Sequence, residues 1–328
     1  MRAKGIAYDT GFVRGGEISV PDFDLDVVRR ELAVIRDELH CNAVHLVGGD
    51  PERLEQAALI AADLGLEVWF SPYPLELKPD EILELFAECA RRAERVRAGG
   101  AEVVFVTGVE LSVMNDGFLD GDDVMDRVNR VLGNPERMLE AGERLNEFLA
   151  RAVKVVREHF GGKITYACIP FERVDWSLFD VMSFELIRSA EVADRYAEGI
   201  RNVVGRGKPV AITGFGTAAW RGSGAVAPRS MEIVDLDAAG RPVRVKDGYV
   251  RDEEEQAAYL RELLEIFEAE GVDGAFVYMF ALNNYTHRPD DPSRDFDIAS
   301  PGVVKVYEDG NWEPKAAFGA VAETYARI

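Results

Sequence analysis

The sequence predicts one α/β domain of the (β/α)8 type, the TIM barrel, spanning residues 1–328. Runs of apolar, mostly β-branched residues alternate with segments of helical spacing, and eight such runs occur. The runs are apolar on both faces, as strands buried in a parallel sheet are. Right-handed crossovers then make all strands parallel. An open doubly wound sheet is the main alternative, but "YDTGFVRGG" after the first strand matches its glycine-rich phosphate loop poorly.

Each predicted strand except one precedes a predicted helix. The predicted strands are 4–9, 42–49, 66–74, 101–110, 163–172, 179–186, 208–216 and 273–282. The predicted helices are 26–39, 50–65, 79–97, 139–160, 190–205, 252–270 and 313–327. In the second helix, Asp50 suits the N-cap, Pro51 the first turn and Gly65 the C-cap. The fifth and sixth strands are joined by a short link, with at most one helical turn around "DWS".

Two insertions interrupt the alternation, and both follow strands. Residues 112–133 lengthen the loop after the fourth strand, and residues 217–251 lengthen the loop after the seventh. In the second insertion, "SMEIVDL" and "RPVRVKDGYV" flank "DAAG", which predicts a β-hairpin. Loops after barrel strands lie on the catalytic face, so these insertions predict a walled cleft there.

The composition excludes several classes of partner. A net charge of -21 argues against nucleic acid and anionic membranes, because phosphate binding needs clustered Lys and Arg. Three scattered cysteines form neither a disulfide framework nor a metal spacing, and we expect no cofactor. With no signal segment and no long apolar run, we expect a cytoplasmic protein. Nothing in the sequence specifies an oligomeric state.

Candidate site residues follow from the ends of the predicted strands, where barrel chemistry lies. They are Asp9, His45, Tyr73, Glu110, Glu172, Glu185, Gly214, Asn283 and His287, with Trp220 in the second insertion. Four carboxylates at one mouth raise one another's pKa, and aromatic rings suit the C–H faces of sugars. The pattern therefore predicts a small carbohydrate or glycoside as the ligand.

Three other functions stay open at this point. Glu110, Glu172 and Glu185, with Asp9 and His45, could hold Mg²⁺ or Mn²⁺ in a sugar isomerase or lyase. The segment "GFGT" with Arg221 could bind a phosphate, although no helix start follows it. A sugar-binding module without turnover is the third possibility.

Several motifs together resemble a known family. The chain resembles the large clan of (β/α)8 retaining glycosidases, clan A, and most resembles a bacterial group often labelled "abortive infection protein". The resemblance rests on "GIAYDTG", "LHCNAV", "GLEVWFSP", "VTGVELS", "KPVAIT" and "WEPKAAF", and spans nearly the whole chain. It implies that Glu110 is the acid/base. The clan's nucleophile falls on Gly214, where relatives read "AITEFG".

Two further departures accompany the glycine. The clan has Asn where this chain has Val109, and often Arg where it has His45. Because glycine cannot attack an anomeric carbon, we expect hydrolysis to be impaired if the position is right. Three explanations stay open: an engineered change, a natural binding protein, or a substitute carboxylate from Glu172 or Glu185.

Overall fold

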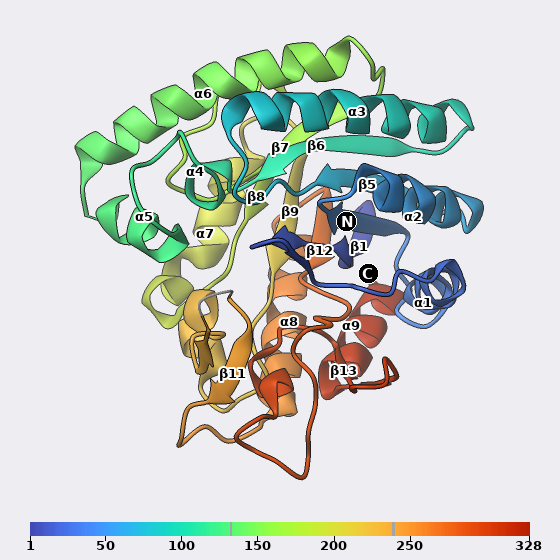
Figure 1. The fold of residues 1–328 in the computed structure, drawn as a ribbon, viewed down its shortest axis with the longest axis vertical. Helices are drawn as coiled ribbons and strands as arrows, with labels where there is room; N and C mark the ends of the chain where they lie inside the picture. Colours follow the sequence, from blue (N-terminus) through green and yellow to red (C-terminus); the bar gives the residue numbers. More distant parts are fainter. Residues whose placement is uncertain (132, 238–239) are drawn as a thin grey trace.

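The barrel is confirmed in the computed structural model, which describes residues 1–131, 133–237 and 240–328 (Figure 1). Eight parallel strands close in the order β1-β12-β9-β8-β7-β6-β5-β4. They are β1 (Ala3–Gly11), β4 (Ala43–Gly48), β5 (Glu67–Pro72), β6 (Val103–Val109), β7 (Lys163–Cys168), β8 (Met182–Glu185), β9 (Val210–Phe215) and β12 (Gly274–Val277). Every carboxyl end therefore opens on one mouth.

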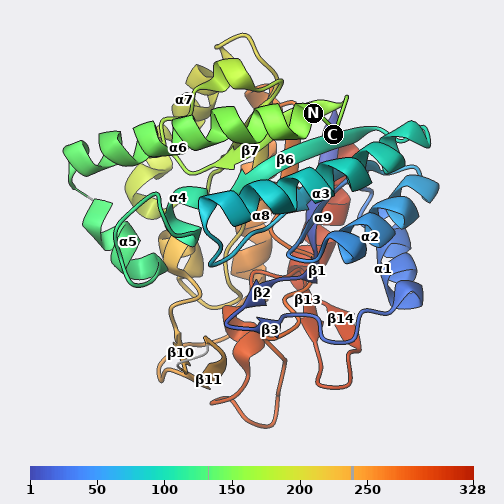
Figure 2. The same ribbon diagram turned by 45° about the horizontal axis from the view of Figure 1, so that its top comes forward.

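Helices surround the strands and shield them from solvent (Figures 1 and 2). They are α1 (Leu25–Asp37), α2 (Pro51–Asp63), α3 (Pro79–Ala98), α4 (Leu111–Met114), α5 (Val124–Val131), α6 (Pro135–Arg157), α7 (Ala193–Val204), α8 (Glu253–Ala269) and α9 (Ala316–Arg327). The two ends of the chain lie close together, and Lys4 Nζ donates to the Ile328 carbonyl at 3.2 Å.

Local sequence signals set several of these boundaries. At α2 the predicted cap is confirmed, since Asp50 accepts from the backbone N–H groups of Glu52 and Arg53 at 2.8 and 3.1 Å. Gly65, with φ 77°, takes the left-handed conformation just past the end of that helix. The link between β7 and β8 is the expected single turn, Trp176–Leu178.

Both insertions follow strands at the mouth. The first carries α4 and α5, so α6 begins at Pro135 instead of the expected 139. The second holds the predicted antiparallel hairpin, formed by β10 (Val234–Leu236) and β11 (Pro242–Val245). Of its predicted "DAAG" turn, residues 238 and 239 lie outside the described residues.

The eighth strand differs most from the sequence expectation. We expected it to reach residue 282, but β12 ends at Val277. The regular ladder stops there, although the N–H groups of Tyr278 and Phe280 still donate to the Phe215 and Ala7 carbonyls, both at 2.9 Å. Two small hairpins were also not predicted: β2 (Val13–Arg14) with β3 (Glu17–Ile18), and β13 (Val304–Val306) with β14 (Trp312–Pro314). The first hairpin follows β1 and lies at the mouth.

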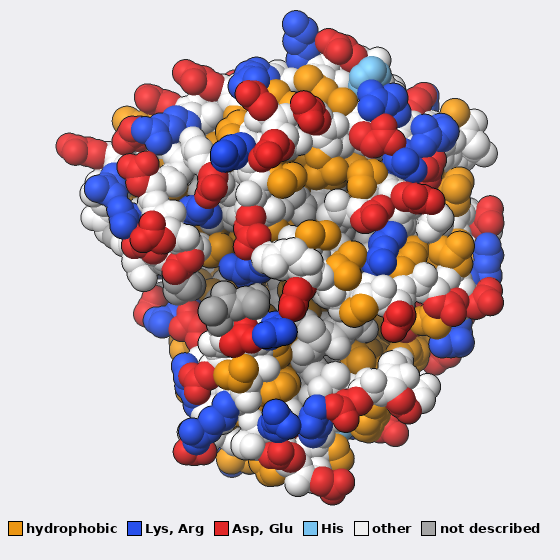
Figure 3. Space-filling view, in the orientation of Figure 1, with side chains coloured by type: hydrophobic (Ala, Val, Ile, Leu, Met, Phe, Trp, Pro, Cys, Tyr) orange, Lys and Arg blue, Asp and Glu red, His pale blue; other side chains and the backbone are white. Residues whose placement is uncertain are grey.

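Apolar side chains fill the barrel, and mixed charges cover it. Trp69 and Phe276 are fully buried inside, with ring centroids 4.7 Å apart. All three cysteines are buried and unbonded. On the face shown in Figure 3, basic side chains are scattered among acidic ones. Among the described residues, no helix is long and apolar enough to cross a bilayer.

Candidate active site

Glu110 is delivered to the mouth by an irregular end of β6. The pairing of β6 with β7 shifts register between Val106 and Val109, and Gly108 within this shift has φ 94°. Glu110 itself is left-handed, with φ 48° and ψ 38°. A non-glycine residue there costs of the order of 1 kcal/mol, and such residues cluster at functional sites. Its carbonyl accepts from the N–H groups of Val113 and Met114, which starts α4.

Glu185 and Gly214 face each other across two neighbouring strands. The β8–β9 ladder pairs them directly, after a register shift that leaves Thr213 out of the pairing. A Cβ placed on Gly214 would lie 2.7 Å from Cδ of Glu185, and closer still to Oε2. The Glu185 carboxyl therefore occupies the space in which a side chain at position 214 would begin. Gly214 is a requirement of this arrangement.

His45 contacts the register shift of β9 from inside the barrel. Its Nδ1 lies 3.2 Å from the carbonyl oxygen of Thr213, the unpaired residue of β9. Burial lowers the pKa of His45 to about 4, so the imidazole is neutral near pH 7. Because Nδ1 faces a carbonyl, Nδ1 carries the proton. His45 thus holds the strand on which Gly214 lies.

Glu172 is a fully satisfied carboxylate beneath the loop that carries Glu110. Its Oε1 accepts from Ser112 Oγ at 2.7 Å and from Tyr166 Oη at 2.8 Å, and its Oε2 from the N–H of Ile169 at 3.0 Å. Tyr166 Oη in turn accepts from the N–H of Leu111 at 2.8 Å. With 1% exposure, Glu172 positions this loop and presents no free oxygen to a ligand.

Asp9 plays a comparable part at the end of β1. It accepts from the N–H of Gly11 and from Ser19 Oγ, both at 2.7 Å. Ser19 Oγ also accepts from the N–H of Phe12, which fixes the β2–β3 hairpin against the barrel. Burial nevertheless raises the pKa of Asp9 to about 6.

Two tyrosines complete the half-buried surface of the mouth. Tyr73, predicted from the end of the third strand, packs edge-on against Phe12 at 5.0 Å. Tyr278 was missed, because it directly follows Val277 and the expected strand ran past it. Burial and the charges of nearby carboxylates raise the pKa of both phenols; for Tyr278 these are Asp9, Glu185 and Glu110. A correct end for β12 would have revealed Tyr278.

The electrostatics of the pair Glu110 and Glu185 are unusual. Burial, then the charge of Glu185, then that of Glu172 hold the pKa of Glu110 well above its usual range. Burial raises the pKa of Glu185 to about 7, and its Oε1 is buried without a hydrogen-bond partner in the described part of the chain. No basic group contributes to either pKa. Burial and the charge of Glu185 therefore favour the protonated form of Glu110.

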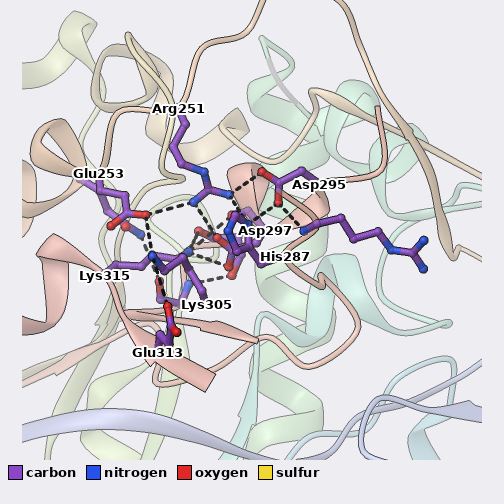
Figure 4. A network of polar contacts seen from close by, with 12 residues as sticks. Arg251, Glu253, His287, Asp295, Asp297, Lys305, Glu313 and Lys315 are labelled. Carbon is purple, nitrogen blue, oxygen red and sulfur yellow. Dashed lines mark hydrogen bonds and ion pairs between the residues drawn. The ribbon is translucent and has the colours of Figure 1, made fainter. Parts of the chain in front are cut away.

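The remaining candidates lie in other surroundings. Trp220 donates its indole N–H to the Ser230 carbonyl at 2.8 Å and anchors the second insertion. Asn283 is half-buried in the turn beyond β12. His287 belongs to a separate ionic network around Arg251, where its Nδ1 lies 2.7 Å from Asp295 (Figure 4).

Within residues 1–131, 133–237 and 240–328, no three His, Cys, Asp or Glu side chains come together so as to hold a metal ion. The metal-dependent alternative therefore lacks a donor set there. A cavity of about 460 Å³ lies near the amino-terminal ends of β6 and β7. Its Arg97 and Arg157 already pair with Glu94 and Asp180.

Comparisons with known proteins support the fold. No protein-family model matches the chain, and no curated protein is similar to it in sequence. Among solved structures, it is similar to a GH113 β-1,4-mannanase (TM-score 0.64, 16% identity, 100% of both chains). It is also similar to the GH113 β-mannanase AaManA from Alicyclobacillus acidocaldarius (0.60, 17%, 99% of this chain and 97% of that one).

A further neighbour is the barrel of a larger enzyme, Bacteroides uniformis β-glucuronidase 2 (TM-score 0.63, 13% identity, 100% of this chain and 35% of that one). Likenesses at these identities establish the (β/α)8 fold shared with glycoside hydrolases, and the activity has to be argued from the site. Nothing in them bears on the group labelled "abortive infection protein", which stays an expectation.

Proposed function

We propose that this protein acts on a carbohydrate as a glycoside hydrolase, with Glu110 as the general acid. The observation that carries the proposal is the Glu110 carboxyl at the barrel mouth, half-buried, on a left-handed residue and uncompensated by any cation. A carboxylic acid kept protonated at neutral pH can protonate the oxygen of a leaving sugar. Tyr73 and Tyr278 supply aromatic surface beside it.

The fold likeness suggests which substrates to test first. The GH113 neighbours are β-mannanases, and another neighbour is a β-glucuronidase. We therefore propose a β-linked sugar as the substrate of this chain. Since Gly214 supplies no side chain, it cannot be the nucleophile, and a two-carboxylate mechanism requires the second carboxylate from another position.

The test is a panel of aryl β-glycosides and β-mannooligosaccharides, assayed with the native chain and with Glu110→Gln. We expect turnover of at least one substrate and a loss of about 10²–10⁴-fold in kcat/KM for Glu110→Gln. The loss should be smallest for aryl leaving groups that need little protonation. Equal turnover by both proteins would contradict the role of Glu110.

Sugar binding without turnover is the second candidate, and the bare backbone at Gly214 favours it. It predicts a dissociation constant of about micromolar size by calorimetry, with no product from any substrate. In that case Glu110 is a hydrogen-bonding group, and Glu110→Gln should weaken binding by about tenfold or more, as loss of a charged hydrogen bond does.

A further inference from the structure

We propose that Glu185 is the catalytic nucleophile, and that Gly214 is glycine because the Glu185 carboxyl occupies its side-chain space. The inference rests on the proposed function and adds a residue to it. It assigns the second carboxylate to β8, the neighbour of the strand on which the family resemblance places that group.

Register and close approach carry the assignment. Glu185 pairs with Gly214 in the β8–β9 ladder, and the N–H of Leu186 donates to the Gly214 carbonyl at 3.1 Å. Side chains at paired positions of neighbouring strands point to the same side of a sheet. With no Cβ on Gly214, the Glu185 carboxyl lies against β9, close to the backbone of position 214.

The Glu185 carboxyl holds no loop, although it is buried and the Thr213 side chain lowers its pKa against the larger effect of burial. Its Oε1 has no hydrogen-bond partner among the described residues, whereas Glu172 and Asp9 use their oxygens to hold loops. Its charge acts on Glu110 ahead of that of Glu172. A retaining mechanism requires the acid/base and nucleophile carboxyls to lie about 5–5.5 Å apart.

The reaction balances with these two groups alone. An electron pair of the ionised Glu185 forms a bond to C1 of the sugar, and the C1–O bond breaks toward the leaving oxygen, which takes the proton of Glu110. Water then bonds to C1 as Glu110 removes its proton, and the bond from Glu185 to C1 breaks. Both carboxyl groups return to their starting states, and the product keeps its anomeric configuration.

Covalent labelling tests the assignment directly. The native protein is treated with 2-deoxy-2-fluoro-β-glycosyl fluorides of the sugars that it hydrolyses, digested and sequenced by mass spectrometry. We expect the adduct on Glu185 and none on Glu172 or Asp9. An adduct on another residue, or product of inverted configuration by NMR, overturns the proposal.

A substitution at Gly214 tests whether the position of the Glu185 carboxyl matters when no charge is changed. Gly214→Ala keeps every carboxylate, but its methyl group would displace the carboxyl of Glu185, so kcat should fall by at least about 100-fold. Gly199→Ala is the matched control, because nothing lies within 4 Å of a Cβ there. Full activity of Gly214→Ala would overturn the proposal.

Substitutions of Glu185 distinguish this inference from the proposed function. Glu185→Gln should be folded and lose at least about 10³-fold in kcat, and Glu185→Ala with Gly214→Glu should recover part of the loss relative to Glu185→Ala. If the native chain hydrolyses a glycoside and Glu185→Gln keeps more than a tenth of its kcat, only the assignment of Glu185 fails. If the native chain hydrolyses no glycoside, both proposals fail.

Discussion

Two clusters of buried carboxylates in this protein differ in whether a basic side chain pairs with them. At the barrel mouth, Glu110 and Glu185 have no counter-charge, and burial raises the pKa of both. In the network of Figure 4, Arg251 contacts Asp295 and Asp297 at 2.8 Å each. The pKa of Asp295 is lowered despite its burial, because Arg251 and His287 hydrogen-bond to it.

The difference separates stabilising carboxylates from reactive ones. A buried carboxylate that only stabilises is paired, and removing its partner is costly. One that is buried without a partner costs stability, and such a residue persists where it serves a function. The network fixes the start of α8 and α9 through Glu253 and Lys315, whereas the mouth retains its unpaired charge.

The largest expected effect lies in the network. Asp297→Asn should destabilise the protein by about 3–5 kcal/mol, because Lys315, which is fully buried, and Arg251 lose their shared partner. Thermal or urea unfolding measures it. Asp247→Asn, in an exposed pair with Arg244, is the matched control, with an expected effect of about 0–1 kcal/mol. Equal effects of the two substitutions would show that the buried network stabilises the protein no more than an exposed ion pair does.

Removing a carboxylate at the mouth should stabilise the protein instead of destabilising it. Glu185→Gln should stabilise the protein by about 1–3 kcal/mol at pH 8, because an unpaired buried charge is removed. The raised pKa of Glu185, about 7, means that its stability contribution is present at low pH and lost as pH rises through 7. The gain should therefore shrink at pH 5. Urea unfolding at both pH values measures it, with Glu147→Gln, exposed on α6, as the control.

The activity should depend on the ionisation of Glu185. If Glu185 must be ionised to react, kcat/KM should fall about tenfold from pH 8 to pH 6, with an apparent pKa near 7. The acidic limb reports Glu185, and the alkaline limb reports loss of the proton from Glu110, whose pKa is raised. A profile that is flat over this range would contradict the assignment.

The smallest expected effect concerns Tyr278. Burial, and then the charges of Asp9, Glu185 and Glu110, raise the pKa of this phenol, and replacement by Phe removes its hydroxyl. A hydrogen bond from this hydroxyl is worth about 0.5–1.5 kcal/mol, so kcat/KM should fall about threefold to tenfold. Tyr307→Phe, outside the mouth, is the control. No difference between the two variants would place Tyr278 outside the reaction.

The sequence predicts strands and caps well where the signal is local. Asp50 capped α2 as expected, and the periodicity of apolar residues placed all eight barrel strands. The end of the eighth strand was misjudged, because "YMFAL" continues the apolar run past Val277, where the regular strand ends. An earlier end for this strand would have added Tyr278 to the candidates.

The relation between Glu185 and Gly214 was beyond reach of sequence reasoning for a different reason. The two residues are 29 positions apart (214 minus 185), and their pairing depends on a one-residue register shift at Thr213. Such shifts arise from packing across strands and have no local sequence signal. Glu185 was named as a possible substitute, but only the structure places its carboxyl over position 214.

Titration of the side-chain carboxyl carbons by ¹³C NMR tests the central claim most directly. We predict one glutamate that titrates near pH 7 and a second that titrates far above the ordinary range. In Glu185→Gln the first signal should vanish and the second should move down, because the charge that raised it is gone. If every glutamate titrates near 4.5, or if the second signal does not move, the charge of Glu185 does not act on Glu110 and the account is wrong.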